Sequence, residues 1–93
     1  MLIKVDGENK EHKIMCYTLS TCVWCKRTKQ WLKDNGYEYE YIDMDYLEGA
    51  EKEKIRDEIK KFCDRISYPT VVIDDKQTIV GHHTEKLAEA LKA

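Results

Sequence analysis

The hydrophobic and polar residues of the chain follow two periods, one typical of strands and one typical of helices. Residues 13–19 form a short apolar run that suits a buried strand. Residues 37–43 alternate mainly aromatic and acidic side chains, which predicts a strand with one covered face. Residues 70–73 are a β-branched run, and we expect them to form a hairpin with residues 77–80 across a tight turn.

Three other stretches have the spacing of amphipathic helices. The first covers residues 24–35, and Asn35 with Gly36 provides its end. Its apolar stripe is expected to consist of Trp24, Thr28, Trp31 and Leu32. A second helix is expected over residues 47–63, and a third follows with Thr84 as its N-cap.

This order of elements, β-α-β-α-β-β-α, predicts an α/β fold. Two strands joined through a helix lie parallel with a right-handed crossover, and the hairpin adds two antiparallel strands. We therefore expect a four-stranded mixed sheet flanked by helices. Residues 2–5 are expected to add an N-terminal strand that pairs with residues 10–14 as a hairpin.

Composition and charge narrow the class of protein. A chain of 93 residues has room for one core, so residues 1–93 are expected to form a single domain. The net charge of −2, with the two signs interspersed, argues against nucleic-acid binding. We find no apolar segment with the length of a membrane span or of a signal peptide. We expect a cytoplasmic monomer that does not bind membranes.

Cys22 and Cys25 carry the candidate chemistry, because they lie between the first predicted core strand and the first predicted helix. Two thiols at this spacing either close a disulfide or hold one metal ion. At a helix start, the unpaired backbone N–H groups stabilise a thiolate on Cys22. We expect Cys22 to attack a substrate disulfide and the more buried Cys25 to resolve the mixed disulfide. Cys16 and Cys63 are expected to be buried apolar residues.

Four stretches of the chain together resemble the glutaredoxin family from about residue 13 to residue 91. They are residues 22–26, 39–43 and 68–71, and Gly81 followed by residues 84–87. The resemblance implies a thioredoxin fold and a thiol–disulfide oxidoreductase whose only redox group is the Cys22–Cys25 disulfide. It implies that Pro69 is cis and faces this disulfide, and that Tyr68 offers its backbone to the substrate. The substrate-binding residues are then expected to be Tyr68, Pro69, Thr70, Trp24, Gly81 and His82.

The chain departs from the glutaredoxins that use glutathione. Those proteins carry a lysine three positions before the first cysteine and a proline after it, where this chain has Leu19 and Val23. They also carry paired glycines where this chain has Gly81, His82 and His83. The pattern is more similar to NrdH-type redoxins. The resemblance therefore implies an electron carrier that reduces protein disulfides, does not depend strongly on glutathione, and is regenerated by a cognate reductase.

Several alternatives stay open at this point. The chain is alternatively a glutathione-dependent glutaredoxin, or an Fe–S cluster carrier in which Cys22 holds a cluster shared between two chains. A third interpretation has zinc bound by Cys22, Cys25, His82 and His83, although we expect no metal site. Trp24 is either an exposed contact for partner proteins or the first core residue of its helix.

Overall fold

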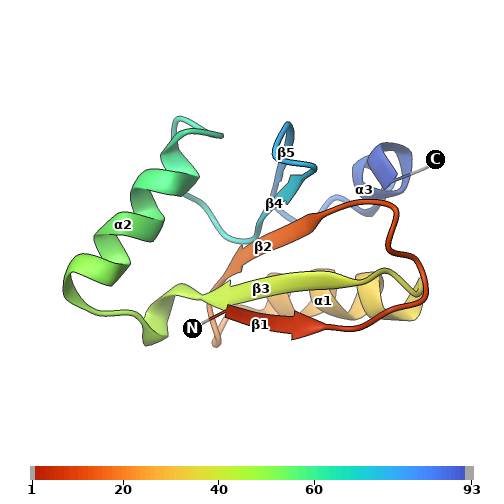
Figure 1. The fold of residues 1–93 in the computed structure, drawn as a ribbon, viewed down its shortest axis with the longest axis horizontal. Coiled ribbons are helices and arrows are strands. Elements are labelled where there is room, and N and C mark those ends of the chain that lie inside the picture. Colours follow the sequence, from red (N-terminus) through yellow and green to blue (C-terminus); the bar gives the residue numbers. More distant parts are fainter. Residues whose placement is uncertain (1, 92–93) are drawn as a thin grey trace.

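The computed structural model describes residues 2–91, which form a five-stranded mixed sheet with helices on both faces (Figure 1). The strands are β1 (Leu2–Val5), β2 (Ile14–Thr18), β3 (Tyr39–Asp43), β4 (Thr70–Ile73) and β5 (Gln77–Val80). The helices are α1 (Val23–Asp34), α2 (Gly49–Lys60) and α3 (Thr84–Leu91), with a short 3-10 helix, η1 (Met44–Tyr46), after β3. The predicted β-α-β-α-β-β-α order is confirmed.

The strand order is β1-β3-β2-β4-β5, with β2 parallel to β3 and antiparallel to β4. The predicted extra strand β1 exists, but the prediction of its partner was wrong. It pairs antiparallel with β3, with Ile3 opposite Tyr41, and does not pair with residues 10–14. The reason is that β2 already has β3 on one edge and β4 on the other, so the free edge lies beside β3.

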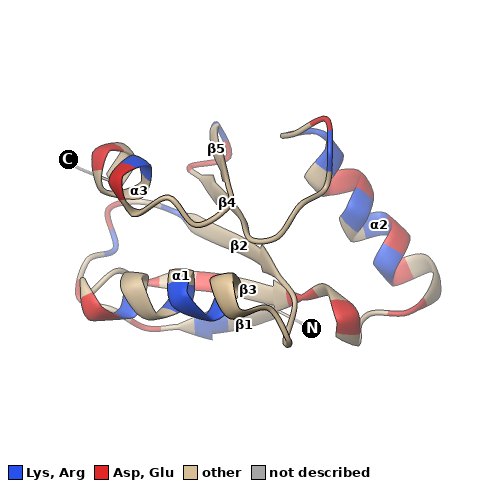
Figure 2. Cartoon of the chain, turned by 180° about the vertical axis from the view of Figure 1, so that it is seen from behind, with Lys and Arg blue, Asp and Glu red and all other residues tan. Residues whose placement is uncertain are grey.

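The two faces of the sheet have separate cores. Leu32 of α1 and Leu87 of α3 pack on one face, whereas Ile59 of α2 packs on the other. Figure 1 shows α1 behind the sheet, and Figure 2, seen from behind, shows it in front. Since side chains alternate along a strand, adjacent residues of β2 serve different cores. Cys16 joins the core with α1 and α3, and Tyr17 joins the core with α2.

The helix boundaries differ from the prediction at both ends of α2, which stops at Lys60 and not at residue 63, and in the cap of α3. After β3 the chain first makes η1, so α2 begins at Gly49 and Leu47 is a buried residue that precedes the helix. α3 begins at Thr84 itself, and the carbonyl oxygen of His83 accepts the N–H of Leu87 at 3.0 Å. His83 therefore occupies the cap position that we predicted for Thr84. Within the described residues, no helix is long and apolar enough to span a membrane.

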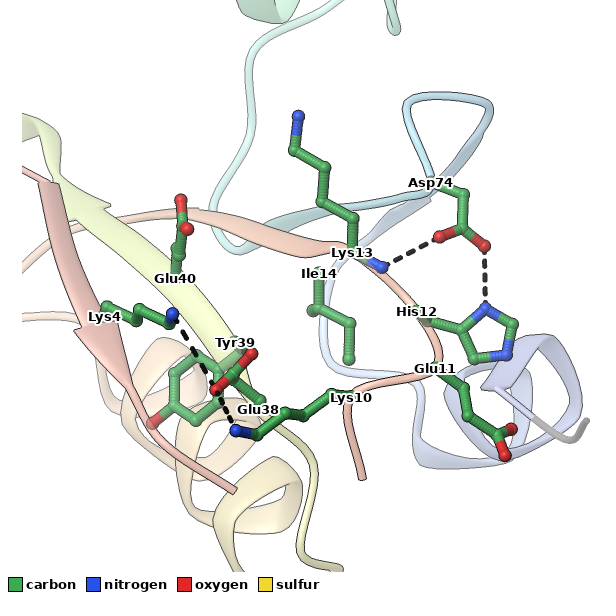
Figure 3. Close-up of a pocket in the computed structure, with 10 residues that line it drawn as sticks. All are labelled: Lys4, Lys10, Glu11, His12, Lys13, Ile14, Glu38, Tyr39, Glu40 and Asp74. Carbon is green, nitrogen blue, oxygen red and sulfur yellow. Dashed lines mark hydrogen bonds and ion pairs between the residues drawn. The ribbon is translucent and has the colours of Figure 1, made fainter. Parts of the chain in front are cut away.

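A pocket of about 400 Å³ lies at the amino end of β2, and most of the side chains that line it are charged (Figure 3). The ammonium groups of Lys4 and Lys10 lie 3.9 and 3.8 Å from Glu38 Oε1. His12 Nδ1 lies 2.7 Å from Asp74 Oδ2. These contacts join the segment between β1 and β2 to β3 and to the β4–β5 turn. Their role here is structural, because Cys22 and Cys25 follow the carboxyl end of β2.

Candidate active site

Cys22 is the N-cap of α1, as predicted. Its sulfur accepts the backbone N–H of Cys25 at 3.2 Å, and its own N–H donates to the carbonyl oxygen of Leu19 at 3.2 Å. The sulfur therefore lies where the first N–H groups of the helix are directed. The N–H dipoles thus point their positive ends toward the Cys22 sulfur.

Cys22 and Cys25 differ in their access to solvent. Cys22 is partly exposed, whereas Cys25 is fully buried. Burial, reinforced by a hydrogen bond with Cys22, raises the pKa of the Cys25 thiol to about 12. Both thiols are free, so the structure shows the reduced pair. The exposed thiol can meet a substrate, and the buried one can react only with the sulfur beside it.

A groove of about 280 Å³ runs between the start of α1 and the segments before β4 and after β5. It is lined by Trp24, Tyr68, Pro69, Gly81, His82 and His83. The Tyr68–Pro69 bond is cis, as the resemblance implied, and the Pro69 carbonyl accepts the N–H of Gly81 at 2.8 Å. Five of the six predicted substrate-binding residues thus come together. The sixth, Thr70, is buried in β4, and its hydroxyl donates to the carbonyl oxygen of Ser67.

Trp24 is a surface residue and not the first core residue of the helix stripe. Its side chain is 55% exposed, its ring stacks on His82 with 5.7 Å between ring centres, and the Arg27 guanidinium lies 5.0 Å from its centre. A hydrogen bond with α1 holds the His82 ring in place, because its Nδ1 lies 2.7 Å from the hydroxyl of the buried Thr28. The fully buried stripe of α1 is instead formed by Cys25, Thr28 and Leu32.

An aspartate that sequence reasoning missed holds the loop before Cys22. The Asp45 carboxylate accepts the backbone N–H of Ser20 at 2.9 Å, and the Ser20 hydroxyl also donates to it. These bonds lower the pKa of the Asp45 carboxyl. The predicted parallel pairing of β2 and β3 could have indicated this contact. Ser20 follows β2 and Asp45 follows β3, and residues beyond the carboxyl ends of neighbouring parallel strands meet at one edge of the sheet.

Sequence reasoning also missed a cluster of polar side chains that joins α1 to the carboxyl ends of β2 and β3. Asp43 Oδ1 lies 3.2 Å from Lys29 Nζ and accepts the Thr18 hydroxyl at 2.6 Å. The side chains of Lys29 and Asp43 are 16% and 11% exposed. Lys29 lies outside the apolar stripe of α1, yet most of its side chain is buried. Lys29 lies four residues after Cys25, so it borders the buried face of α1.

The zinc interpretation has no matching geometry. Within residues 2–91, no three His, Cys, Asp or Glu side chains group closely enough to hold a metal ion. Cys22, Cys25, His82 and His83 therefore do not form a shared site in this conformation. His82 also has another contact, since its Nδ1 faces the Thr28 hydroxyl.

Comparisons with known proteins identify relatives of this chain. A family model described as glutaredoxin matches residues 14–78. A glutaredoxin from Methanosarcina mazei, known from a crystal structure, is 39% identical in sequence to this chain. The two structures superpose with a TM-score of 0.90 over 99% of this chain and 88% of that one. The NrdH-redoxin of Escherichia coli has a TM-score of 0.66 over 87% and 97% of the two chains. At 22% identity that likeness shows the shared fold alone.

A curated relative from Caenorhabditis elegans, described as an uncharacterized monothiol glutaredoxin, is 32% identical over 91% of this chain. The match covers 56% of that relative, so the chain spans little more than half of its length. The five-stranded sheet with α1 and α3 on one face and α2 on the other is the thioredoxin-like fold of these structures.

Proposed function

The chain belongs to the glutaredoxin family, and we propose that it is a dithiol–disulfide oxidoreductase that reduces protein disulfides. The observation that carries this proposal is the asymmetry of the pair. Cys22 is partly exposed at the N-cap of α1, and Cys25 is buried one turn away. An exposed nucleophile beside a shielded second thiol suits a reaction that proceeds through a mixed disulfide.

The reaction has two exchange steps. The Cys22 thiolate attacks one sulfur of the client disulfide, a new S–S bond forms, and the other client sulfur leaves as a thiolate that takes up a proton. Cys25 then loses its proton and attacks Cys22 Sγ, which releases the second client thiol. Two electrons have passed to the client, and the protein holds a Cys22–Cys25 disulfide. A cognate reductase returns two electrons and two protons.

The groove supports a protein client more than glutathione. Leu19, where glutathione-using relatives have a lysine, is partly buried and packs in the core with α2, so it offers no cation to a carboxylate. His82 is held against Trp24 and narrows the side of the groove that glycines leave open. Trp24 is 55% exposed, and exposed aromatic side chains of this kind anchor protein interfaces.

The proposal is tested by insulin reduction with different electron donors. The oxidised protein is offered a thioredoxin-type reductase, a ferredoxin-dependent reductase or glutathione, and reduction of its disulfide is followed for each. We expect a reductase to be the efficient donor. Efficient reduction by glutathione alone would contradict the preference for protein partners.

Two variants test the roles of the cysteines. Cys22→Ser is expected to abolish insulin reduction, because no other exposed thiol lies at the start of α1. Cys25→Ser is expected to accumulate a mixed disulfide between Cys22 and the client, which mass spectrometry detects. Insulin reduction that persists in Cys22→Ser would refute the proposed function. The Fe–S alternative predicts visible absorbance and bound iron after anaerobic reconstitution, and a colourless, iron-free protein would exclude it.

A further inference from the structure

Lys29 differs from the other lysines of α1 because its side chain turns inward. Its ammonium nitrogen lies 3.2 Å from Asp43 Oδ1 and 3.9 Å from the centre of the Tyr41 ring. Lys26 and Lys33, on the same helix, are exposed. Lys29 therefore brings a positive charge into the space between α1 and β3.

Two relations place this charge near the buried thiols. Cys25 and Lys29 are four residues apart on one helix, so their Cβ atoms lie roughly 6 Å apart on the same face. Tyr41, which the ammonium group covers, pairs in register with Cys16 of the neighbouring strand β2. Both Cys16 and Cys25 are fully buried. The cation and the two thiols thus share the layer between α1 and the sheet.

We propose that Lys29 is a positioning residue for the second exchange step, in which its charge stabilises the Cys25 thiolate that resolves the mixed disulfide. The inference rests on the proposed function and adds a residue that the redox pair alone does not reveal. Asp43 fixes the ammonium group, and Thr18 in turn holds Asp43 through a 2.6 Å hydrogen bond. These two residues are the last ones of β3 and β2.

The second step is the one in which such a charge matters. Cys25 must lose its proton before its sulfur attacks Cys22 Sγ. The Cys22–Cys25 bond then forms, and the client sulfur leaves with the bonding electron pair and takes up a proton, so electrons and protons balance. Burial opposes the deprotonation, because it raises the pKa of the Cys25 thiol, whereas a backbone hydrogen bond with Leu19 and, to a smaller extent, the charge of Lys29 act in the opposite direction.

Lys26 and Arg27 follow Cys25 on α1 but are exposed, and His82 contacts Thr28; none of these three is among the charges that act on Cys25. The other groups with a titratable side chain or a polar contact in this region are Cys22 on α1, Cys16 and Thr18 on β2, Tyr41 and Asp43 on β3, and Tyr68 before β4. Each of these is neutral or becomes negative when it ionises. Among the charged groups that act on Cys25 in the described residues, Lys29 is the positive one.

Ellman's reagent separates the two steps in one experiment. When the reduced protein meets this reagent, the attack of Cys22 releases one nitrothiobenzoate anion, and resolution by Cys25 releases a second. Stopped-flow absorbance records two phases. For Lys29→Met we expect the second phase to be about threefold slower between pH 6 and 8, with the first phase unchanged. A tenfold smaller thiolate fraction gives about this slowing, because a more basic thiolate is also a better nucleophile.

Two controls distinguish charge from structure. Lys29→Arg, which keeps the charge, is expected to restore the second phase, and Lys33→Met, on the exposed face, is expected to leave both phases unchanged. An unaltered second phase in Lys29→Met, or an equal slowing of both phases, would overturn the inference. If Lys29→Met does not fold, Lys29→Gln, which also removes the charge, is expected to show the same slow second phase. Absence of a second phase in the unmodified protein would instead refute the proposed function.

Discussion

Replacing Asp43 by asparagine tests whether the ion pair beneath the active site holds α1 against the sheet. Asp43 accepts the Thr18 hydroxyl at 2.6 Å and faces the Lys29 ammonium at 3.2 Å. An amide of nearly the same shape keeps an oxygen for Thr18. It leaves the Lys29 ammonium, which is 16% exposed, without its counter-charge. The expected result is a folded but less stable protein.

The size of the loss follows from how much of the pair remains in contact with water. A hydrogen bond to a charged group contributes about 1.5–3 kcal/mol, and breaking a fully buried pair costs about 3–5 kcal/mol. The Lys29 and Asp43 side chains are 16% and 11% exposed, so water still reaches part of the pair. We therefore expect Asp43→Asn to lower the free energy of unfolding by about 1.5–3 kcal/mol, as for a charged hydrogen bond. A loss of about 2 kcal/mol corresponds to a fall in Tm of about 8–16 °C for a domain of this size.

Urea denaturation followed by circular dichroism gives the free energy of unfolding for Asp43→Asn. Asp57→Asn serves as the matched control, because Asp57 lies exposed on α2. Lys29→Met completes a double-mutant cycle, in which the double variant is expected to lose less stability than the sum of the two single losses. The reasoning is refuted if Asp43→Asn loses no more stability than Asp57→Asn, or if the two single losses simply add.

Three further predictions concern the exposed Trp24, the buried cysteines and the core of α1. Trp24→Ala is expected to raise KM for insulin about fivefold with kcat unchanged, because an exposed anchor of about 1 kcal/mol is lost; an unchanged KM would show that Trp24 is not a client contact. Burial raises the pKa of both Cys16 and Cys25 to about 12, so their thiols ionise first in the unfolded chain. The free energy of unfolding is therefore expected to be constant below about pH 9 and to fall as the pH rises toward 12. The fall is expected to be less steep in Cys16→Ala. Parallel pH dependences of the urea midpoint in the two proteins would contradict this. Leu32→Ala removes a fully buried side chain and is expected to cost about 2–5 kcal/mol in urea denaturation, and a loss below about 1 kcal/mol would mean that α1 packs loosely.

Local patterns predicted most of the secondary structure, and the error in strand pairing has a tertiary cause. The strands at 70–73 and 77–80 and the helix that follows Cys22 agree with the structure, because their signals are short-range: β-branching, a tight turn, and a capped amphipathic period. β1 was assigned the wrong partner because strand pairing depends on which sheet edge is free. That is a property of the assembled sheet, and no local pattern reports it.

The candidate site divides in the same way. The positions of Cys22 and Cys25 and the cis bond before Pro69 were predicted from spacing and from a family resemblance. Trp24 had an apolar position in the helical period, yet it is exposed, and its ring stacks on His82 at the surface. Lys29 lies outside the apolar stripe, and no local pattern shows that its long side chain, at the border of a helix face, reaches a partner on the sheet.

The order of elements, the two-residue spacing of the cysteines and the place of Cys22 at a helix start can be read from the sequence alone, because each depends on neighbours a few residues away. The surroundings of that pair depend on the assembled fold. It joined Asp45 to Ser20, Lys29 to Asp43, and His82 to Thr28. These contacts join residues 14 to 54 positions apart in the chain. They form only when the carboxyl ends of β2 and β3 and the loop after β5 meet at one edge of the sheet.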